Sequence, residues 1–290
     1  MTVPRGDMVP FAWHHMALRV PEHWELIGFK KNPRDGRVVL ADRNGETLQA
    51  FWKIIRQTPA VRQLLTSLVS KLTEGRISPT EARRSIKEIA GWHVAMPREP
   101  ELPLFAARWH ESQRVLLNFT FPPHPDTAVR ARVHEILASW QPNDGPDRLW
   151  AAFGLEFTLP EAWRLDEVTA LPACQVMRFE DRKGQTVAIH RYGMMPAILQ
   201  GEDMPTFFAR VRGRGAMLRR TGTFTKEGRH EGAELSYETR GKSGWSMLAR
   251  TWQGRVWLWR RDDLKRLYAI DHHAMKKHFI WDLAERVRGR

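Results

Sequence analysis

The chain has little of several features that define particular protein classes. Cys174 is the single cysteine among 290 residues, which excludes an internal disulfide framework and a cysteine-only zinc site. No apolar run approaches the roughly 18–20 residues of a membrane helix, so we expect no membrane span. Residues 1–7 are not followed by an apolar segment, which argues against a secretory signal. These absences predict a soluble, cytoplasmic protein.

The chain also lacks the spacing motifs of common catalytic and nucleotide-binding sites. Gly241-Lys242-Ser243 is not preceded by the first glycine of a phosphate-binding loop, and neither H-E-x-x-H nor G-x-S-x-G occurs. We therefore expect no cofactor and no metal. An enzyme with a site between two domains is kept as a third possibility, with Asp271, His272 and His273 as the first residues to test.

Two segments of the chain are similar to each other. At an offset of 139 residues, segment 12–53 aligns without a gap with segment 151–192. Both contain Pro-Glu-x-Trp and, further on, Asp-Arg-x-Gly. Apolar residues recur at every second position around these motifs, which is the period of a half-buried strand. Each segment therefore predicts strand, corner, strand, hairpin turn and strand, with glycine where a tight turn asks for positive φ.

We expect the shared residues to be structural rather than ligand contacts. Proline fixes the direction of the chain as it leaves the first strand, and tryptophan fills the space beside the sheet. A feature present in both copies is more simply explained as part of the scaffold than as part of a binding site. The residues of this structural repeat motif are Pro21, Trp24, Asp42, Gly45, Pro160, Trp163, Asp181 and Gly184.

The pattern of an apolar strand ending in Pro-x-x-Trp, followed by Asp-x-x-Gly, resembles the Mog1/PsbP/DcrB-like superfamily. The resemblance is carried by Val20–Trp24 with Leu40–Gly45, and by Leu159–Trp163 with Phe179–Gly184. It implies an α/β/α-type sandwich around an antiparallel sheet, here in tandem. It also implies a non-catalytic adaptor or assembly factor, because members of that superfamily are mostly of that kind.

Periodicity elsewhere predicts helices and further strands. Helical patterns cover about 59–72, a segment opening at Ser78 with a capping box, about 127–140, 205–211 and 274–287. Strands are expected at 104–109, 114–121, 233–239, 245–252, 256–260 and 266–271. We predict an α+β fold of two tandem repeats, 8–141 with a helical insertion at about 56–90, and 148–290. Each would be an antiparallel sheet covered by helices, and a linker rich in Pro, Gly and Asp would join them at 141–147.

Charge is the strongest functional signal of the chain. The net charge is +13, and residues 205–290 carry +11 whereas residues 146–204 carry −3. Segment Val256–Trp259 is either a strand buried on both faces or an edge strand with aromatics on one side. A basic face with aromatic rings suits an anionic partner, since cations displace counterions and rings stack on bases. The residues expected to bind are Arg210, Arg212, Arg214, Arg219, Arg220, Arg255, Trp257, Trp259, Arg260, Arg261, Lys265 and Arg266.

We therefore expect a non-catalytic intracellular binding or adaptor protein whose basic second domain engages an anionic partner, either an acidic protein or nucleic acid. Direct binding of RNA or DNA through the same Arg/Trp surface is the alternative, and anionic lipid would be attracted by the same charge. If the tryptophans are core and the arginines solvated, the charge marks no site. The sequence leaves the oligomeric state open.

Overall fold

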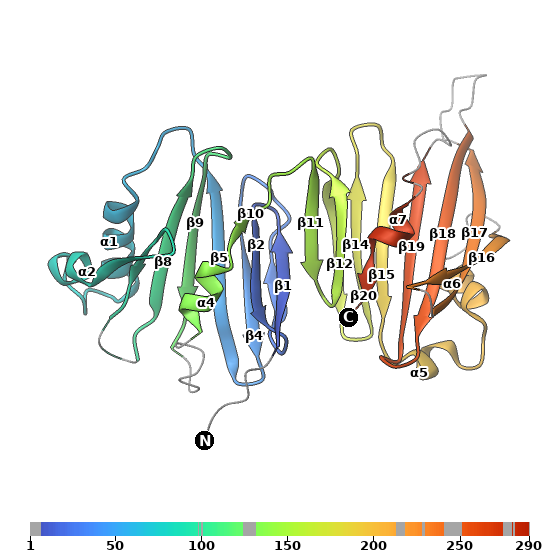
Figure 1. Ribbon diagram of the computed structural model, residues 1–290, viewed down its shortest axis with the longest axis horizontal. Coiled ribbons are helices and arrows are strands. Elements are labelled where there is room, and N and C mark those ends of the chain that lie inside the picture. Colours follow the sequence, from blue (N-terminus) through green and yellow to red (C-terminus); the bar gives the residue numbers. More distant parts are fainter. Residues whose placement is uncertain are drawn as a thin grey trace. The chain divides into compact units, whose positions relative to one another are not determined.

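The computed structural model describes residues 7–97, 99, 101–123, 132–212, 218–227, 230–240, 251–274, 280 and 282–289. It divides into two compact units, Met1–Ala152 (unit 1) and Phe153–Arg290 (unit 2). Antiparallel strands dominate both units (Figure 1). Of the described residues, 53% lie in strands and 17% in helices, so the chain is mostly β.

Unit 1 is built on a seven-stranded sheet with the strand order β3-β4-β5-β9-β8-β7-β6. These strands are β3 (Glu25–Phe29), β4 (Asp35–Asp42), β5 (Gly45–Ile54), β6 (Ile86–Ile89), β7 (Trp92–Ala95), β8 (Leu104–His110) and β9 (Val115–Phe121). Shorter strands pair in the order β10-β2-β1-β11, namely β1 (Met8–Trp13), β2 (Met16–Pro21), β10 (Gln141–Pro142) and β11 (Asp147–Ala152). The helices of this unit are α1 (Val61–Leu72), α2 (Pro79–Ser85) and α4 (Val133–Ala138).

Unit 2 contains a second seven-stranded sheet, with the order β13-β14-β15-β19-β18-β17-β16. Its strands are β13 (Arg164–Leu171), β14 (Cys174–Glu180), β15 (Thr186–Tyr192), β16 (Arg219–Lys226), β17 (His230–Arg240), β18 (Thr251–Arg261) and β19 (Arg266–Ala274). A short pair consists of β12 (Leu155–Pro160) and β20 (Arg288–Gly289). The helices are α5 (Met195–Leu199), α6 (Met204–Arg212) and α7 (Leu283–Arg286). The order of strands along the chain and across the sheet is the same as in the large sheet of unit 1.

The Pro-Glu-x-Trp corner has the same geometry in both units. The backbone N–H of Trp24 donates to the Pro21 carbonyl at 3.0 Å, and Trp163 donates to Pro160 at 3.0 Å. Both indole rings are buried, at 6% and 7% exposure. Burial of rings this large stabilises the unit that holds them, and the corner is structural in each.

The two predicted glycine turns share a positive φ and an aspartate contact but differ in length, since Asp42 pairs with Gly45 whereas Glu180 pairs with Thr186. Gly45 and Gly184 have φ values of 139° and 77°, which side chains other than glycine rarely adopt. In each turn an aspartate carboxylate accepts from the backbone N–H two residues on. Asp42 Oδ1 accepts from Asn44 at 2.7 Å, and Asp181 Oδ1 accepts from Lys183 at 2.7 Å.

The helices cover only one part of each large sheet. In unit 1, α1 packs on the sheet through Val61, Leu65 and Val69. Helix α2 begins with the predicted capping box, in which Ser78 Oγ accepts from the Glu81 N–H and the Glu81 carboxylate accepts from the Ser78 N–H. In unit 2, α5 and α6 cover the equivalent face through residues such as Phe207 and Phe208.

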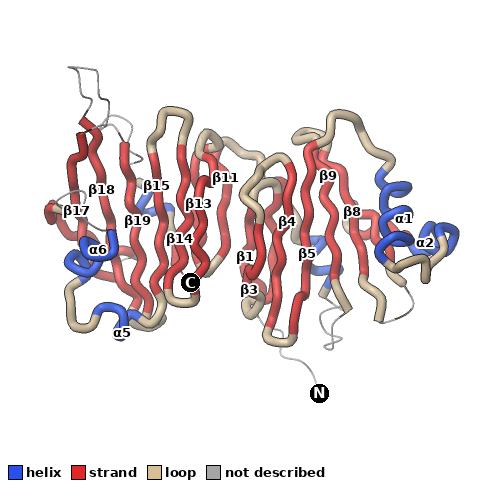
Figure 2. Tube along the Cα trace, turned by 180° about the vertical axis from the view of Figure 1, so that it is seen from behind, coloured by secondary structure: helices blue, strands red, loops and turns tan. Residues whose placement is uncertain are grey.

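The predicted α/β/α-like sandwich of sheets covered by helices is therefore wrong (Figure 2). The sheet faces opposite α1, α5 and α6 are covered mainly by short strands, and in unit 1 helix α4 lies with them, since Trp92 Nε1 donates to the Leu137 carbonyl at 3.2 Å. Trp13 of β1 packs on Phe29 at 5.5 Å, and Phe157 of β12 packs on Phe179 at 5.6 Å. The apolar spacing at 127–140 and 274–287 predicted long closing helices. The structure has the shorter helices α4 and α7 there, of six and four residues. Residues 124–131 and 275–279 lie outside the described part. Apolar residues three or four apart need only one helical turn to reach the core, so the pattern overstated helix length.

The structure decides between the two alternatives for segment Val256–Trp259, which lies in β18. Segment Val256–Trp259 is buried on both faces of the sheet, with β17 on one side and β19 on the other.

The predicted linker at 141–147 is not an open connection. Asn143 is 5% exposed, and its side-chain amide donates to the carbonyls of His14 and Leu149 at 3.0 and 2.7 Å. A short polar side chain that bonds backbone groups of other segments makes a Pro/Gly/Asp-rich stretch part of the fold.

Candidate functional site

The tryptophans of the predicted Arg/Trp surface lie in the interior of unit 2. Trp257 is 5% exposed and Trp259 1% exposed. The Trp259 ring stacks on Tyr268 with the ring centres 5.4 Å apart. Neither ring is accessible to a base, so these two residues do not form a stacking platform.

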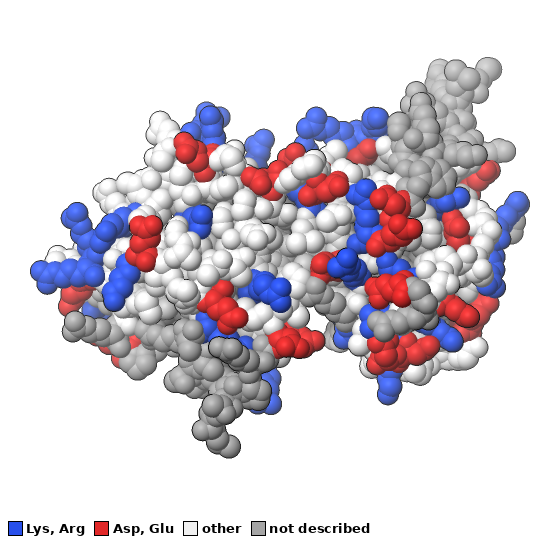
Figure 3. Space-filling model, in the orientation of Figure 1, with Lys and Arg blue, Asp and Glu red and all other residues white. Residues whose placement is uncertain are grey.

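Most arginines of the predicted surface are engaged by carboxylates within the unit. The nitrogen–oxygen distances range from 2.6 to 3.3 Å. The pairs are Arg210–Glu202, Arg212–Asp271, Arg255–Glu234, Arg260–Asp262 and Arg261–Asp263. On the face that Figure 3 shows, basic and acidic side chains of unit 2 are interspersed. Five of the predicted arginines are therefore locally paired, although the excess of positive charge over residues 205–290 remains, and Arg214 lies outside the described residues.

Four predicted residues remain outside these pairs. Arg219 and Arg220 are exposed and open the edge strand β16. Lys265 and Arg266 lie at the turn between β18 and β19, and only Lys265 is exposed. Arg220 is close enough to Asp203 to contribute to the lowered pKa of that carboxyl, although hydrogen bonds from Thr206 are the larger cause. Arg219 and Arg220 are thus two adjacent exposed cations on one edge strand, and the rest of the predicted set is dispersed.

Asp271, which we singled out as a candidate catalytic residue, is the centre of a polar network on the helix-covered face of unit 2. Its Oδ2 accepts from Arg212 Nε at 2.8 Å and its Oδ1 accepts from the Tyr237 hydroxyl at 2.7 Å. The Arg212 guanidinium also lies 3.7 Å from the centre of the Tyr237 ring. Burial, with Asp271 as the next cause, raises the pKa of Tyr237. Both carboxylate oxygens are occupied, which suits a structural anchor for the end of α6.

The two histidines beside Asp271 point to opposite faces of β19. His272 is fully buried, its ring packs edge-on to Trp163 at 5.6 Å, and burial lowers its pKa to about 4. His273 stacks on Trp252 with the ring centres 5.2 Å apart. Alternation along a strand separates the rings, so they cannot act together on one substrate atom or one metal ion. Among the residues that the structure describes, no group of three metal-ligating side chains occurs.

A Ser-His-Asp cluster that the sequence analysis missed lies in unit 1. Ser112 Oγ is 3.0 Å from His110 Nε2, and Asp144 Oδ2 is 3.2 Å from the same nitrogen. Ser112 Oγ also donates to Asp144 Oδ2 at 3.0 Å. In a nucleophilic triad the carboxylate holds the other ring nitrogen, so that Nε2 is left for the serine. Here both contact Nε2, and the three residues tie the 110–114 turn to the segment before β11.

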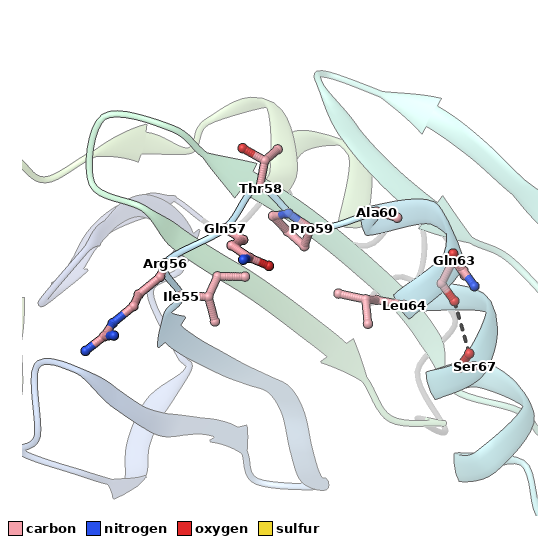
Figure 4. A pocket seen from close by; sticks show the side chains of 9 residues that line it. All are labelled: Ile55, Arg56, Gln57, Thr58, Pro59, Ala60, Gln63, Leu64 and Ser67. Atoms are coloured by element: carbon pink, nitrogen blue, oxygen red, sulfur yellow. Dashed lines mark hydrogen bonds between the residues drawn. The ribbon is translucent and has the colours of Figure 1, made fainter.

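A second group of basic side chains is gathered by the fold of unit 1. They come from the β3–β4 loop, the end of β5 and the 110–114 turn, segments that are far apart in the sequence. No single stretch of the sequence predicts this group, because each of the three segments contributes only one to four basic residues. Beside them lies a hollow between the end of β5 and α1 (Figure 4).

None of the helices that the structure describes has the length and apolar character needed to cross a bilayer.

Comparisons with known proteins find little. No family model matches the chain, and no curated protein matches it. Among solved structures, the cyanobacterial PsbP (CyanoP) of Synechocystis sp. PCC 6803 is 11% identical, with a TM-score of 0.37, over 51% of this chain and 94% of that one. The apo immunity protein TplEi of the T6SS of Pseudomonas aeruginosa is also 11% identical, with a TM-score of 0.30, over 99% and 98%. The first is a PsbP protein, the kind that the strand–corner motif resembles, and neither likeness assigns a function.

Proposed function

We propose that this chain is a non-catalytic binding protein whose second unit engages an anionic partner. The observation that carries the proposal is the free edge of the unit 2 sheet. Strand β16 is the last strand of that sheet and is exposed over most of its length. It begins with Arg219 and Arg220, neither of which forms an ion pair with another described residue.

An edge strand offers two kinds of contact to an acidic polypeptide. Its outer N–H and C=O groups have no neighbouring strand among the described residues and can pair with an added one. Arg219 lies opposite Ser236 and Arg220 opposite Leu235, so the two guanidinium groups extend on opposite faces of the sheet. Successive carboxylates of an added strand also alternate between faces, which would place one beside each arginine.

Nucleic acid remains the alternative partner. It fits less well because base stacking requires exposed aromatic rings. The large hydrophobic residues most exposed among the described positions are all aliphatic or methionine: Ile27, Ile54, Leu64, Leu72, Met96, Leu171, Met194 and Val211. Binding through phosphates alone would be unspecific and steeply dependent on salt.

As part of the proposal, we interpret the chain as two copies of one PsbP-like sheet domain in a cytoplasmic protein. Support comes from strand positions, since β1 and β2 recur 139 residues later as β11 and β12 with the same lengths. The corner and turn bonds recur at the same spacing. A duplicated scaffold suits a binding protein, because surfaces can diverge while the fold is kept.

The test is a charge reversal with a matched control. The variant Arg219→Glu/Arg220→Glu is compared with Arg182→Glu/Lys183→Glu, which reverses two adjacent exposed charges at another turn of unit 2. The probes are a fluorescein-labelled 15-residue glutamate peptide and a 20-nucleotide single-stranded RNA, at about 50 and 200 mM salt. We expect the first variant to lose about tenfold or more of its affinity for the peptide and the control to lose less than about twofold. Tighter binding of RNA would favour the alternative, and an equal loss in both variants would show that only net charge matters.

A further inference from the structure

One end of the large sheet of unit 1 carries a concentration of exposed positive charge. Three backbone hydrogen bonds bring its segments together: Ile54 N–H to Arg34 at 2.7 Å, Ile55 N–H to Arg114 at 2.9 Å and Lys30 N–H to Arg37 at 2.8 Å. The exposed basic residues of these segments are Lys30, Lys31, Arg34, Arg37, Lys53, Arg56 and Arg114. The acidic residues in or beside them are Asp35, Glu111 and Asp144. We call this group the basic end of unit 1.

The loop that carries most of these charges is held by buried side chains below it. Trp13 Nε1 donates to the carbonyl of Lys30 at 3.2 Å, and Trp52 Nε1 donates to that of Asn32 at 3.0 Å. His15 is 5% exposed and donates to the carbonyl of Pro33 through Nε2. With three carbonyls of residues 30–33 bound from below, the loop has a defined position. Its charged side chains are therefore held at the surface at no further ordering cost to the backbone when a ligand binds.

A hollow of about 590 Å³ adjoins the basic end. It is lined by residues 55–60 at the exit from β5 and by Gln63, Leu64 and Ser67 on the first turns of α1. In Figure 4, Leu64 points from the helix toward Ile55 across the hollow, and Arg56 extends away from both. The lining combines an aliphatic floor with a basic and polar rim, which is the usual composition of a site for an amphipathic ligand.

Two aliphatic residues at this place are left largely outside the core of the unit. Helix α1 packs on its sheet through Val61, Leu65 and Val69, whereas Leu64 is 45% exposed on another side of the helix. Ile54, at the end of β5, is 41% exposed. Exposed aliphatic side chains rimmed by arginine and lysine are typical of a surface that binds another polypeptide.

We propose that the basic end of unit 1 and the adjoining hollow form a docking site for an acidic polypeptide segment that carries an apolar side chain. The acidic residues meet Arg34, Lys53 and Arg56, and the apolar side chain enters the hollow between Ile55 and Leu64. The inference rests on the proposed function in that the protein is a binder of anionic partners, but it assigns the contact to the other unit.

The shape and chemistry of the surface favour this partner over two others. RNA and DNA have no aliphatic side chain to place in the hollow, and no aromatic residue is among the large exposed hydrophobics of the described chain. Insertion into a lipid surface uses apolar residues that protrude. Here Ile55 and Leu64 line a concave space, which receives a side chain rather than entering a membrane.

The experiment uses the full chain and two labelled peptides, each built from blocks of four glutamates. One peptide has a single leucine between successive blocks and the other a single serine. The variant Leu64→Ser removes the floor of the hollow. Its control is Leu72→Ser, on the same helix and 49% exposed but outside the hollow. A third variant, Arg34→Glu/Lys53→Glu/Arg56→Glu, reverses the charge of the rim. A 20-nucleotide RNA and phosphatidylglycerol vesicles complete the set of probes.

We expect the leucine peptide to bind about tenfold more tightly than the serine peptide. Leu64→Ser should abolish that difference, Leu72→Ser should keep it, and the charge-reversed variant should lose both peptides and much of the salt dependence. A leucine preference unchanged by Leu64→Ser would overturn the inference, as would a stronger dependence of RNA or vesicle binding on the same residues. Peptide binding lost only in Arg219→Glu/Arg220→Glu would overturn it while leaving the proposed function intact. Absence of peptide binding by the wild-type chain would overturn both.

Discussion

The same end of the two large sheets is built alike in the two units but carries much more positive charge in unit 1 than in unit 2. In unit 1 the N–H of Ile54 donates to Arg34 at 2.7 Å, and in unit 2, 139 residues further on, Gly193 donates to Ala173 at 3.0 Å. Six of the seven residues of the basic end of unit 1 have uncharged counterparts at that spacing: Thr169, Ala170, Ala173, Val176, Tyr192 and Met195. The seventh, Arg114, is matched at the equivalent turn by Lys265, whose carbonyl accepts from Met195 as that of Arg114 accepts from Ile55. Leu171 and Met194 are 59% and 61% exposed there.

The difference shows where the two units are free to vary. Backbone bonds, the Trp24 and Trp163 corners and the glycine turns maintain the sheet in each unit, while exposed loop positions such as Arg34 and Ala173 differ in charge. The surface charge of the loops is therefore independent of the scaffold beneath them. Functional residues should therefore be sought at the positions where the two units differ rather than at those that they share.

The largest expected effect comes from removing the anchor of the basic loop. Trp52 is 2% exposed, donates to Asn32 and packs over Gly36, where an added Cβ would come within 2.4 Å of the ring. We expect Trp52→Ala to destabilise unit 1 by about 3–5 kcal/mol. Arg191, its counterpart in unit 2, bonds Gln175 at 2.9 Å, and Arg191→Ala should cost roughly 1–2 kcal/mol. Chemical denaturation measures both, and equal losses would contradict the assigned role of Trp52.

The next effect depends on pH and concerns the β1–β2 turn. Burial, with His15 and Arg148 as further causes, lowers the pKa of His14 to about 3. The folded state therefore holds His14 neutral while the unfolded chain takes up a proton near pH 6.5. The contribution of His14 to stability is complete above pH 6.5 and is lost as the pH falls from 6.5 toward 3, by about 1.4 kcal/mol per unit.

Phe153 occupies the corresponding turn of unit 2, where φ is 55° against 47° for His14. The variant His14→Phe therefore copies a residue that the same backbone accepts. Between pH 7 and 5 we expect the variant to lose less free energy of unfolding than the wild type, by the contribution of the one proton that His14 takes up on unfolding. Chemical denaturation at pH 7 and at pH 5 measures both losses. If the pH dependence of the variant matches that of the wild type, His14 is not a source of acid sensitivity.

The smallest effect should follow from exchanging surface character between the units. The variant Leu171→Lys/Met194→Arg adds two positive charges to this end of unit 2, at the positions that correspond to Asn32 and Ile55 of unit 1. Both side chains are largely exposed, so the free energy of unfolding should change by less than about 0.5 kcal/mol. Thermal denaturation checks this, and a clear loss would show that Leu171 and Met194 are buried against something in solution.

Much of the strand structure is predictable from local pattern. Alternation identified β2, β4 and β5 and their counterparts, because one face of each strand must be apolar. The corner, the glycine turns and the Ser78 capping box are each defined by a few neighbouring residues. The error in fold class arose because a spacing of three or four residues marks a helix without giving its length, and because nothing local showed that short strands cover the opposite sheet faces.

The candidate site was much less predictable. The Arg and Trp residues of 255–261 looked like a surface because a strand buried on both faces has the same composition as an exposed amphipathic one. The basic end of unit 1 was missed for the opposite reason. Lys30, Lys53 and Arg114 stand apart in the chain, and only backbone bonds across the sheet bring their segments together.

The sequence by itself determined the net charge, the repeating strand–corner–turn pattern and the absence of a disulfide framework, since each depends on composition or on residues within one turn of the chain. Tertiary structure decided which charges are paired, which tryptophans are buried and where exposed basic residues gather. The physical reason is that burial and ion pairing depend on which strands lie next to one another. Strand pairing joins residues tens of positions apart, so no local pattern contains it.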